Sequence, residues 1–156
     1  MPDRAVGLRQ DSCGAGKHRG GLGIDVRVRN LVEGRWNFEQ ARRLDCPPWG
    51  LWGGAAGEAG GYLLRLPGEN EFKTKVGAHI PVPLHAEAIV RTGGGGGWGD
   101  PLDRDPRLVR ADVSEELVSR LAAREHYGVV FQGDLVIDQE ATKKLRDWMR
   151  SQRKSS

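Results

Sequence analysis

The fold is decided by the stretch Thr92-Gly93-Gly94-Gly95-Gly96-Gly97-Trp98-Gly99-Asp100-Pro101. Consecutive glycines lose more backbone freedom on folding than other residues, so a folded chain keeps them where its backbone turns sharply or approaches something closely. Residues 86–91 before them read as a strand, Trp98 offers an apolar anchor, and Asp100-Pro101 has turn chemistry. The alternative is a flexible linker, but linkers rarely carry tryptophan. We therefore expect an ordered glycine ribbon.

Glycine is the outlier of the composition. It accounts for 23 of the 156 residues, whereas the usual share is about 7%. The glycines show no three-residue period, which excludes collagen, and they cluster between apolar runs. Hydrophobic residues make up only 38% of the chain, which is lean for a core. We infer that another polypeptide covers part of the surface.

Charge and cysteine content exclude several classes of partner. The net charge is +3, from 24 basic and 21 acidic residues, which is too weak and too mixed to favour nucleic acid. No apolar run approaches the roughly 20 residues that span a bilayer, and the N-terminus has no signal-peptide core. We expect neither nucleic acid nor membrane as a partner. The two cysteines, Cys13 and Cys46, lack metal-ligand spacing and predict a reducing, cytoplasmic location.

The first half of the chain predicts short strands and loops. Residues 1–10 read as an extended lead-in, and 11–150 as the main region. Ile24–Arg29 alternates apolar and charged residues, which predicts a half-buried strand with Ile24, Val26 and Val28 facing inward. Its expected partner is the alternating segment around Trp36 and Phe38. Two further predictions complete this half: a hairpin of 62–66 with 72–76, and an edge strand or connector at 80–84.

The second half predicts helices. Asp112 with Glu115 fits a reciprocal cap, so a helix is expected from Asp112 to about His126. Two short strands follow about Gln132-Gly133. Asp138 then caps a final helix that ends near Arg150, before a disordered tail at 151–156. The residues expected to be buried by these helices are Val113, Leu117, Leu121, Ala122, Ala141, Leu145, Trp148 and Met149. The fold class is α+β: mainly short strands, then a helix, a hairpin and a C-terminal helix.

The segment 14–20, Gly-Ala-Gly-Lys-His-Arg-Gly, only partly resembles a nucleotide-binding loop. A P-loop needs glycine where Asp11 stands and serine or threonine where His18 stands. The segment also precedes a strand instead of following one, which contradicts the dinucleotide fingerprint. Nucleotide binding is therefore not expected here.

Catalytic and ion-binding interpretations stay open at two places. A Cys13–histidine pair lacks a third, orienting group, and a lone cysteine is more often a small buried hydrophobe. His18, Arg19 and Arg104 could hold an anion; equally, these charges could pair with one another and rigidify the loops. The expected counter-charges are Asp11, Asp100, Asp103 and Asp105. The four histidines have no close spacing that predicts a metal site.

Four stretches stand out in order along the chain. They are 11–23 (Asp-Ser-Cys-Gly-Ala-Gly-Lys-His-Arg-Gly-Gly-Leu-Gly), 47–54 (Pro-Pro-Trp-Gly-Leu-Trp-Gly-Gly), 93–106 (five glycines, then Trp-Gly-Asp-Pro-Leu-Asp-Arg-Asp-Pro) and 122–130 (Ala-Ala-Arg-Glu-His-Tyr-Gly-Val-Val). Together they resemble the C-terminal part of the hydantoinase B family, which includes subunits of N-methylhydantoinase, oxoprolinase, and acetone and acetophenone carboxylases. The resemblance runs from about Asp11 to Arg146. Cys13 departs from it, because glycine is expected there.

The resemblance implies a reaction shared between subunits. An ATP-using hydantoinase A-type subunit would phosphorylate a carbonyl of a cyclic amide or ketone. The B-type subunit would then act on the activated species by hydrolytic ring opening or by carboxylation. Phosphorylation helps because an amide carbonyl is a poor electrophile and gains a good leaving group.

Family members are several times longer, and the resemblance places their metal-binding Asp and His residues in an N-terminal half that has no counterpart here. We therefore expect a fragment of a larger subunit that binds no cofactor itself and has little or no activity alone. ATP with Mg²⁺ and a divalent metal would belong to the parent complex. The implied partners are the N-terminal half of the B subunit and the A-type subunit.

The glycine and tryptophan loops are the candidate pocket walls or subunit contacts. These candidates are Arg19, Gly20, Gly21, Trp49, Gly94, Gly95, Gly96 and Asp100; no catalytic or metal-binding residue is assigned. Three functions stay open: an enzyme component, a structural or subunit-docking module, and independent binding of a small ligand near Arg19.

Overall fold

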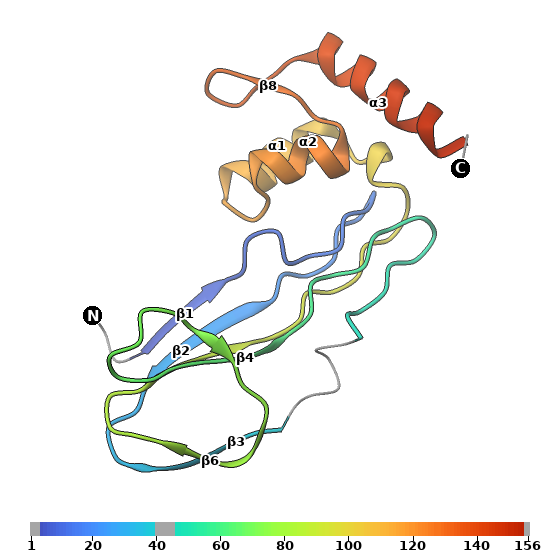
Figure 1. The fold of residues 1–156 in the computed structure, drawn as a ribbon. Coiled ribbons are helices and arrows are strands. Elements are labelled where there is room, and N and C mark those ends of the chain that lie inside the picture. The colour runs from blue at the N-terminus through green and yellow to red at the C-terminus, as the bar shows by residue number, and fades with distance from the viewer. Residues whose placement is uncertain (1–3, 40–45, 155–156) are drawn as a thin grey trace.

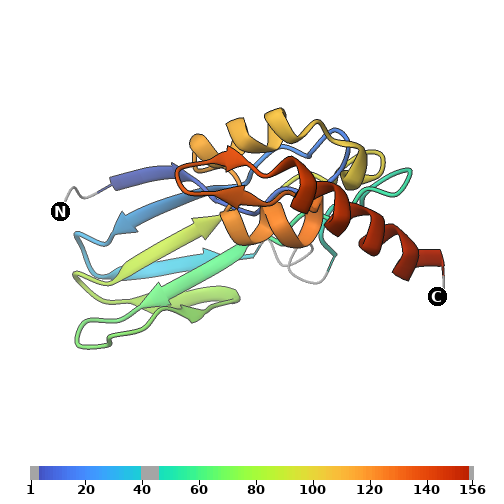
Figure 2. The same cartoon turned by 90° about the horizontal axis from the view of Figure 1, so that it is seen from above.

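The computed structural model describes residues 4–39 and 46–154. Most of its strands lie at one end, and its helices lie with one short hairpin at the other (Figure 1). Extended segments without regular secondary structure run side by side between the two ends, and the view from above shows the same separation (Figure 2). No helix in the described ranges is long and apolar enough to span a bilayer.

A five-stranded antiparallel sheet occupies the first end. Its strand order is β1 (Arg4–Leu8), β2 (Ile24–Arg29), β7 (Glu87–Arg91), β4 (Gly61–Arg65) and β5 (Lys73–Thr74). The predicted strand before the glycines and the predicted hairpin of β4 with β5 are both confirmed. The expected lead-in is in part a strand, because β1 pairs with β2 along its length.

The predicted partner of β2 is wrong. Strand β3 (Gly34–Phe38) pairs with β6 (Gly77–Val82) as a separate two-stranded sheet, while β2 lies between β1 and β7. Phe38 and Val82 from this pair pack against Leu64 and Ala88 of the large sheet, and these residues belong to one buried cluster. Burying the aromatic ring of Phe38 between two sheets is worth more than a local hairpin, so packing decides the partner.

Helices α1 (Pro106–Ser114), α2 (Arg120–Tyr127) and α3 (Gln139–Lys154) form the other end. The hairpin β8 (Phe131–Gln132) with β9 (Val136–Ile137) connects α2 to α3, as predicted. The second buried cluster lies where α1 and α2 meet the glycine-rich segments. Its fully or largely buried members are Ala15, Val109, Val118, Ala122, Ala123, Tyr127 and Val129.

The expected single helix from Asp112 to His126 is two helices. The Asp105 side chain accepts a hydrogen bond from the Arg107 N–H, so α1 begins six residues earlier than expected, at Pro106. Glu116 adopts a φ of 58°, which breaks the helix. Ser119 then caps α2 by accepting a hydrogen bond from the Ala122 N–H. Consequently the capping role predicted for Asp112 is wrong, since Asp112 lies inside α1.

The final helix begins as predicted but extends further. Asp138 accepts a hydrogen bond from the Ala141 N–H, which confirms its capping role. The helix continues to Lys154, so residues 151–154 of the expected disordered tail are helical; residues 155–156 lie outside the described part. Trp148, expected to be buried, is 60% exposed, and Leu121 of α2 is also exposed. The helical spacing predicted that both residues lie on the buried face of their helices, and this prediction is wrong.

Three ribbons, residues 11–23, 46–60 and 92–99, join the two ends, and we call them the glycine bundle. Two rows of backbone hydrogen bonds cross it. The rows are Gly94 N–H to Glu58 O with Glu58 N–H to Ser12 O, and Gly97 N–H to Ala55 O with Ala55 N–H to Ala15 O. The rows are three residues apart on every ribbon, which is the repeat of a polyproline II helix. The backbone hydrogen bonds between the ribbons therefore recur every three residues, although the glycines in the sequence show no three-residue period.

Three of the five glycines, Gly94, Gly96 and Gly97, are needed because other backbone lies where their side chains would be. A β-carbon at Gly94 would overlap the carbonyl oxygen of Ser12, and one at Gly96 would overlap that of Trp49. Backbone cannot move aside as a flexible side chain can, so these positions accept only glycine. The predicted ordered ribbon is confirmed in the structure.

Substituting Gly94 by alanine tests this packing, with Gly21→Ala as the matched control. A β-carbon at Gly21 meets no atom within 4 Å. We expect Gly94→Ala to lower the free energy of unfolding by about 1–3 kcal/mol or more, as overpacked sites do. Gly21→Ala should change it by less than about 0.5 kcal/mol. Urea unfolding monitored by tryptophan fluorescence measures both, and equal shifts would contradict the close packing.

Candidate functional site

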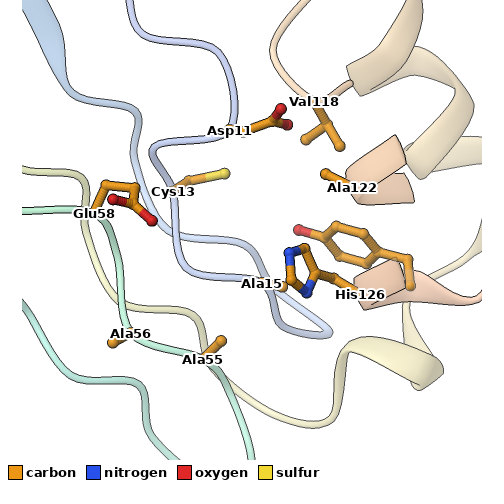
Figure 3. Close-up of a pocket in the computed structure, with 10 residues that line it drawn as sticks. Asp11, Cys13, Ala15, Ala55, Ala56, Glu58, Val118, Ala122 and His126 are labelled. Atoms are coloured by element: carbon orange, nitrogen blue, oxygen red, sulfur yellow. The ribbon is translucent and has the colours of Figure 1, made fainter. Parts of the chain in front are cut away.

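A pocket of about 110 Å³ opens between the glycine bundle and α2 (Figure 3). Two ribbons and one helix supply its walls, and most of the lining side chains are small. The lining residues are Asp11, Cys13, Ala15, Ala55, Ala56, Glu58, Val118, Ala122, His126 and Tyr127. The bundle fixes one wall through its backbone hydrogen bonds, and α2 fixes the other.

Tyr127 is the most unusual residue of this pocket. It is the last residue of α2 and only 2% exposed. Gly128, with a φ of 62°, ends the helix after it, and Arg146 Nε donates to the Tyr127 carbonyl at 2.9 Å. Its hydroxyl is buried, and no group among the described residues forms a hydrogen bond with it. Burial raises the pKa of Tyr127, so the hydroxyl keeps its proton at neutral pH.

Cys13 and His126 line the same pocket, so the structure brings together one candidate cysteine–histidine pair. A nucleophilic cysteine needs a lowered pKa, whereas burial raises the pKa of the Cys13 thiol. This shift favours the interpretation of Cys13 as a small buried residue. Within residues 4–39 and 46–154, no three His, Cys, Asp or Glu side chains are grouped as metal ligands would be.

Arg19 and Arg104 share one buried carboxylate. Arg19 Nε lies 2.8 Å from Asp112 Oδ1, and Arg104 Nη2 lies 2.9 Å from Asp112 Oδ2. The same guanidinium groups also donate to the bundle backbone, Arg104 to the Lys17 carbonyl and Arg19 to that of Gly20. Of the two interpretations left open, pairing of charges therefore describes Arg19 and Arg104, but their partner is Asp112 and none of the four expected aspartates. The cluster ties the first ribbon to α1.

The predicted glycine candidates lie inside the bundle. Gly20 and Gly94 are buried, and a β-carbon at either would overlap neighbouring backbone. Gly95 N–H donates to the carbonyl of the exposed Gly21 at 2.8 Å, and Gly95 O accepts from the Gly14 N–H at 2.8 Å. Their surroundings are therefore other ribbons of the same chain.

Asp100 belongs to the junction of the bundle with the helices. Its Oδ1 accepts from the Leu102 N–H at 2.8 Å and caps a short 3₁₀ helix at Pro101–Asp103. The same oxygen accepts from Arg153 Nη1 at 2.9 Å. Asp100 thus fixes the end of the ribbon and contacts the last turns of α3.

Trp49 belongs to a group of large exposed apolar side chains on the bundle. Trp49 is 74% and Trp52 is 81% exposed, and Leu51 and Trp98 are exposed with them. Leu51 N–H donates to the carbonyl of Gly97, next to Trp98, which holds the two ribbons together there. Trp52 has a φ of 52°, a strained conformation for a bulky residue. We call Trp49, Leu51, Trp52 and Trp98 the tryptophan patch.

None of the eight predicted candidates lines the pocket, although four of them lie on the two ribbons that form its wall: Arg19, Gly20, Gly21 and Trp49. Sequence reasoning missed Glu58 and Tyr127. Glu58 stands in a stretch with no distinguishing pattern, and Tyr127 belongs to the stretch 122–130 that carries the family resemblance but assigns it no role. A tyrosine two residues before a pair of valines gives no signal that its hydroxyl lacks a partner.

A sequence model of the hydantoinase B/oxoprolinase family matches residues 4–101. The chain belongs to this family. It is 33% identical over 145 residues to the caprolactamase subunit beta of Pseudomonas jessenii, covering 86% of this chain and 24% of that subunit. It is 28% identical over 169 residues to the acetophenone carboxylase delta subunit of Aromatoleum aromaticum, covering 88% of this chain and 25% of that subunit. The resemblance inferred from the four stretches is confirmed.

The fold agrees with this assignment. The crystal structure of the ATP-dependent caprolactamase from Pseudomonas jessenii superposes with a TM-score of 0.71 at 29% identity, over 92% of this chain and 25% of that one. The chain therefore spans about a quarter of the length of the relatives that it matches. The mixed α and β architecture, expected as part of a larger subunit, is confirmed.

Replacing Asp112 by asparagine tests the buried charge cluster. The substitution leaves two guanidinium groups with no carboxylate between them, and breaking a buried ion pair costs about 3–5 kcal/mol. We expect a loss of unfolding free energy of about 3 kcal/mol in urea. Asp134→Asn is the control, because Asp134 pairs with Arg120 at 3.8 Å on a fully exposed site. A loss for Asp112→Asn no larger than for the control would contradict a structural role.

Proposed function

We propose that this chain is the C-terminal segment of a B-type subunit in an ATP-dependent enzyme that opens a cyclic amide by hydrolysis. The observation that carries the proposal is the match to the hydantoinase B/oxoprolinase family along residues 4–101, by a chain that spans a quarter of its relatives. The ATP-dependent caprolactamase supports hydrolysis, because its name denotes cleavage of a cyclic amide. Acetophenone carboxylase shows that the family also includes another reaction.

In this proposal the chain contributes shape more than chemistry. The A-type subunit uses ATP to activate the substrate carbonyl, and the remainder of the B-type subunit holds the divalent metal. The glycine bundle gives the assembly a rigid wall, because its ribbons are fixed by backbone hydrogen bonds in two rows. By itself the chain has little or no turnover.

The alternative is a structural module that docks subunits without touching substrate, and the tryptophan patch favours it. Exposed apolar patches of this kind mark interaction surfaces, and tryptophan is enriched among residues that dominate binding energy. Trp52 has a strained backbone conformation and a ring that the chain's own core does not cover. The rest of the B-type subunit would cover the patch.

Reconstitution tests the enzymatic proposal. The chain is co-expressed with the N-terminal part of a B-type subunit and an A-type subunit, and ATP-dependent ring opening is measured with hydantoin, 5-oxoproline and caprolactam. We expect turnover of at least one cyclic amide by the assembly and none by the chain alone. Failure of a stable assembly to open any of them would refute the proposal, as would turnover by the isolated chain.

The tryptophan patch gives a separate prediction about docking. We expect Trp52→Ser to weaken assembly at least tenfold, measured by size-exclusion chromatography with light scattering. Trp148→Ser is the matched control, because Trp148 is also exposed but lies on α3. If Trp52→Ser assembles normally and loses turnover, the patch contacts substrate and the docking role is wrong.

A further inference from the structure

We propose that the pocket between the glycine bundle and α2 binds a small neutral carboxamide group. In this arrangement the amide oxygen accepts a hydrogen bond from the Tyr127 hydroxyl, and the amide N–H groups face the carboxylates of Asp11 and Glu58. The proposal does not depend on the proposed function, because binding here needs neither ATP nor another subunit.

The inner end of the pocket offers a donor. Tyr127 is nearly fully buried, its hydroxyl lacks a partner among the described residues, and it lines the cavity. A buried hydroxyl without a hydrogen bond is costly, so an acceptor bound beside Tyr127 would remove that cost. Since the phenol stays protonated, it presents a proton and not a negative charge.

The pocket also offers acceptors. Asp11 and Glu58 lie on different ribbons, with Cys13 between them in Figure 3, and both residues are exposed. Asp11 Oδ1 already accepts from the Ser119 N–H at 2.7 Å, which fixes the carboxylate while leaving further acceptor capacity. Glu58 is fixed by its backbone, which bonds to a ribbon on either side. Acceptors near solvent and a donor inside match the two ends of a carboxamide.

The carboxylates of the lining and the charge cluster near Tyr127 differ in sign, which disfavours one ion that reaches both. The two carboxylates, Asp11 and Glu58, repel an anion. Tyr127 interacts electrostatically with Arg19, Arg104 and Asp112, where two guanidinium groups face one carboxylate. This excess positive charge opposes a cation at the inner end. A neutral group that both donates and accepts is the remaining match.

The walls set the size of the ligand. They are small and apolar, formed by Ala15, Ala55, Ala56, Val118 and Ala122, around a cavity of about 110 Å³. Such a space accommodates an amide with a short alkyl chain and no ring substituents. The carboxamide could belong to a free small molecule or to an asparagine or glutamine side chain of another polypeptide.

Cys13 provides the readout, and Cys46 is an internal control. Both cysteines are free, with Cys13 partly buried in the pocket and Cys46 exposed. Iodoacetamide alkylates each thiol when the thiolate sulfur displaces iodide from the CH₂ carbon, and peptide mass spectrometry measures the two rates on the intact chain at one alkaline pH. We expect propionamide to slow alkylation of Cys13 at least fivefold without affecting Cys46. Capped glutamine is tested in parallel. If it protects Cys13 at a lower concentration than propionamide does, the carboxamide belongs to a protein side chain; otherwise it belongs to a free small molecule.

Matched ligands and variants decide the outcome. Propionate and propylammonium have similar size but opposite charges, and neither should protect Cys13. Tyr127→Phe should abolish protection by propionamide, and Glu58→Gln, at an exposed residue, should weaken it. No protection by either amide, equal protection by an ion, or unchanged protection in Tyr127→Phe would overturn the proposal. If Cys13 does not alkylate, titration of the His126 imidazole resonances with the same ligands and variants distinguishes the same outcomes.

Discussion

Close contact between bare backbones is the constraint on which this structure depends. Three ribbons approach until a β-carbon at Gly94 would overlap a neighbouring carbonyl oxygen, and hydrogen bonds repeat every three residues across them. Glycine loses much conformational freedom on folding, so each of these positions is costly to order. The hydrogen bonds and the packing of carbonyl against backbone offset that loss only where all three ribbons are present together. The bundle therefore forms as a unit.

The bundle positions the surrounding features at both ends. Toward the sheet, the first ribbon leads into β2 and the third ribbon follows β7. These two strands are neighbours in the sheet. Toward the helices, Arg19 and Arg104 join the first ribbon to Asp112 of α1, and Ala15 packs into the helical core. The pocket with Tyr127 lies at this second junction because a ribbon of backbone cannot fill the space against a helix as side chains do.

Much of the local structure could be predicted from the sequence, whereas the contacts between segments far apart in the chain could not. Strand β7, the β4–β5 hairpin and the Asp138 cap follow from alternation, turn residues and capping chemistry, which act between near neighbours. The partner of β3 and the break between α1 and α2 depend on distant packing and on the unusual φ of Glu116. Likewise, the pocket joins Glu58 to Tyr127, which no local pattern connects.

The sequence by itself determined that this chain has an ordered glycine ribbon, an α+β order of elements and membership of the hydantoinase B/oxoprolinase family, because motifs and glycine runs are local and readable in one dimension. Only the tertiary structure decided that hydrogen bonds between the ribbons recur every three residues, although the glycines have no such period in the sequence. Each row of these bonds takes one residue from each of the three ribbons. The tertiary structure also decided that Arg19 pairs with Asp112. It placed the Tyr127 hydroxyl in a pocket where no group among the described residues forms a hydrogen bond with it. Such contacts join residues far apart in the chain, and their energies exist only when folding brings them together.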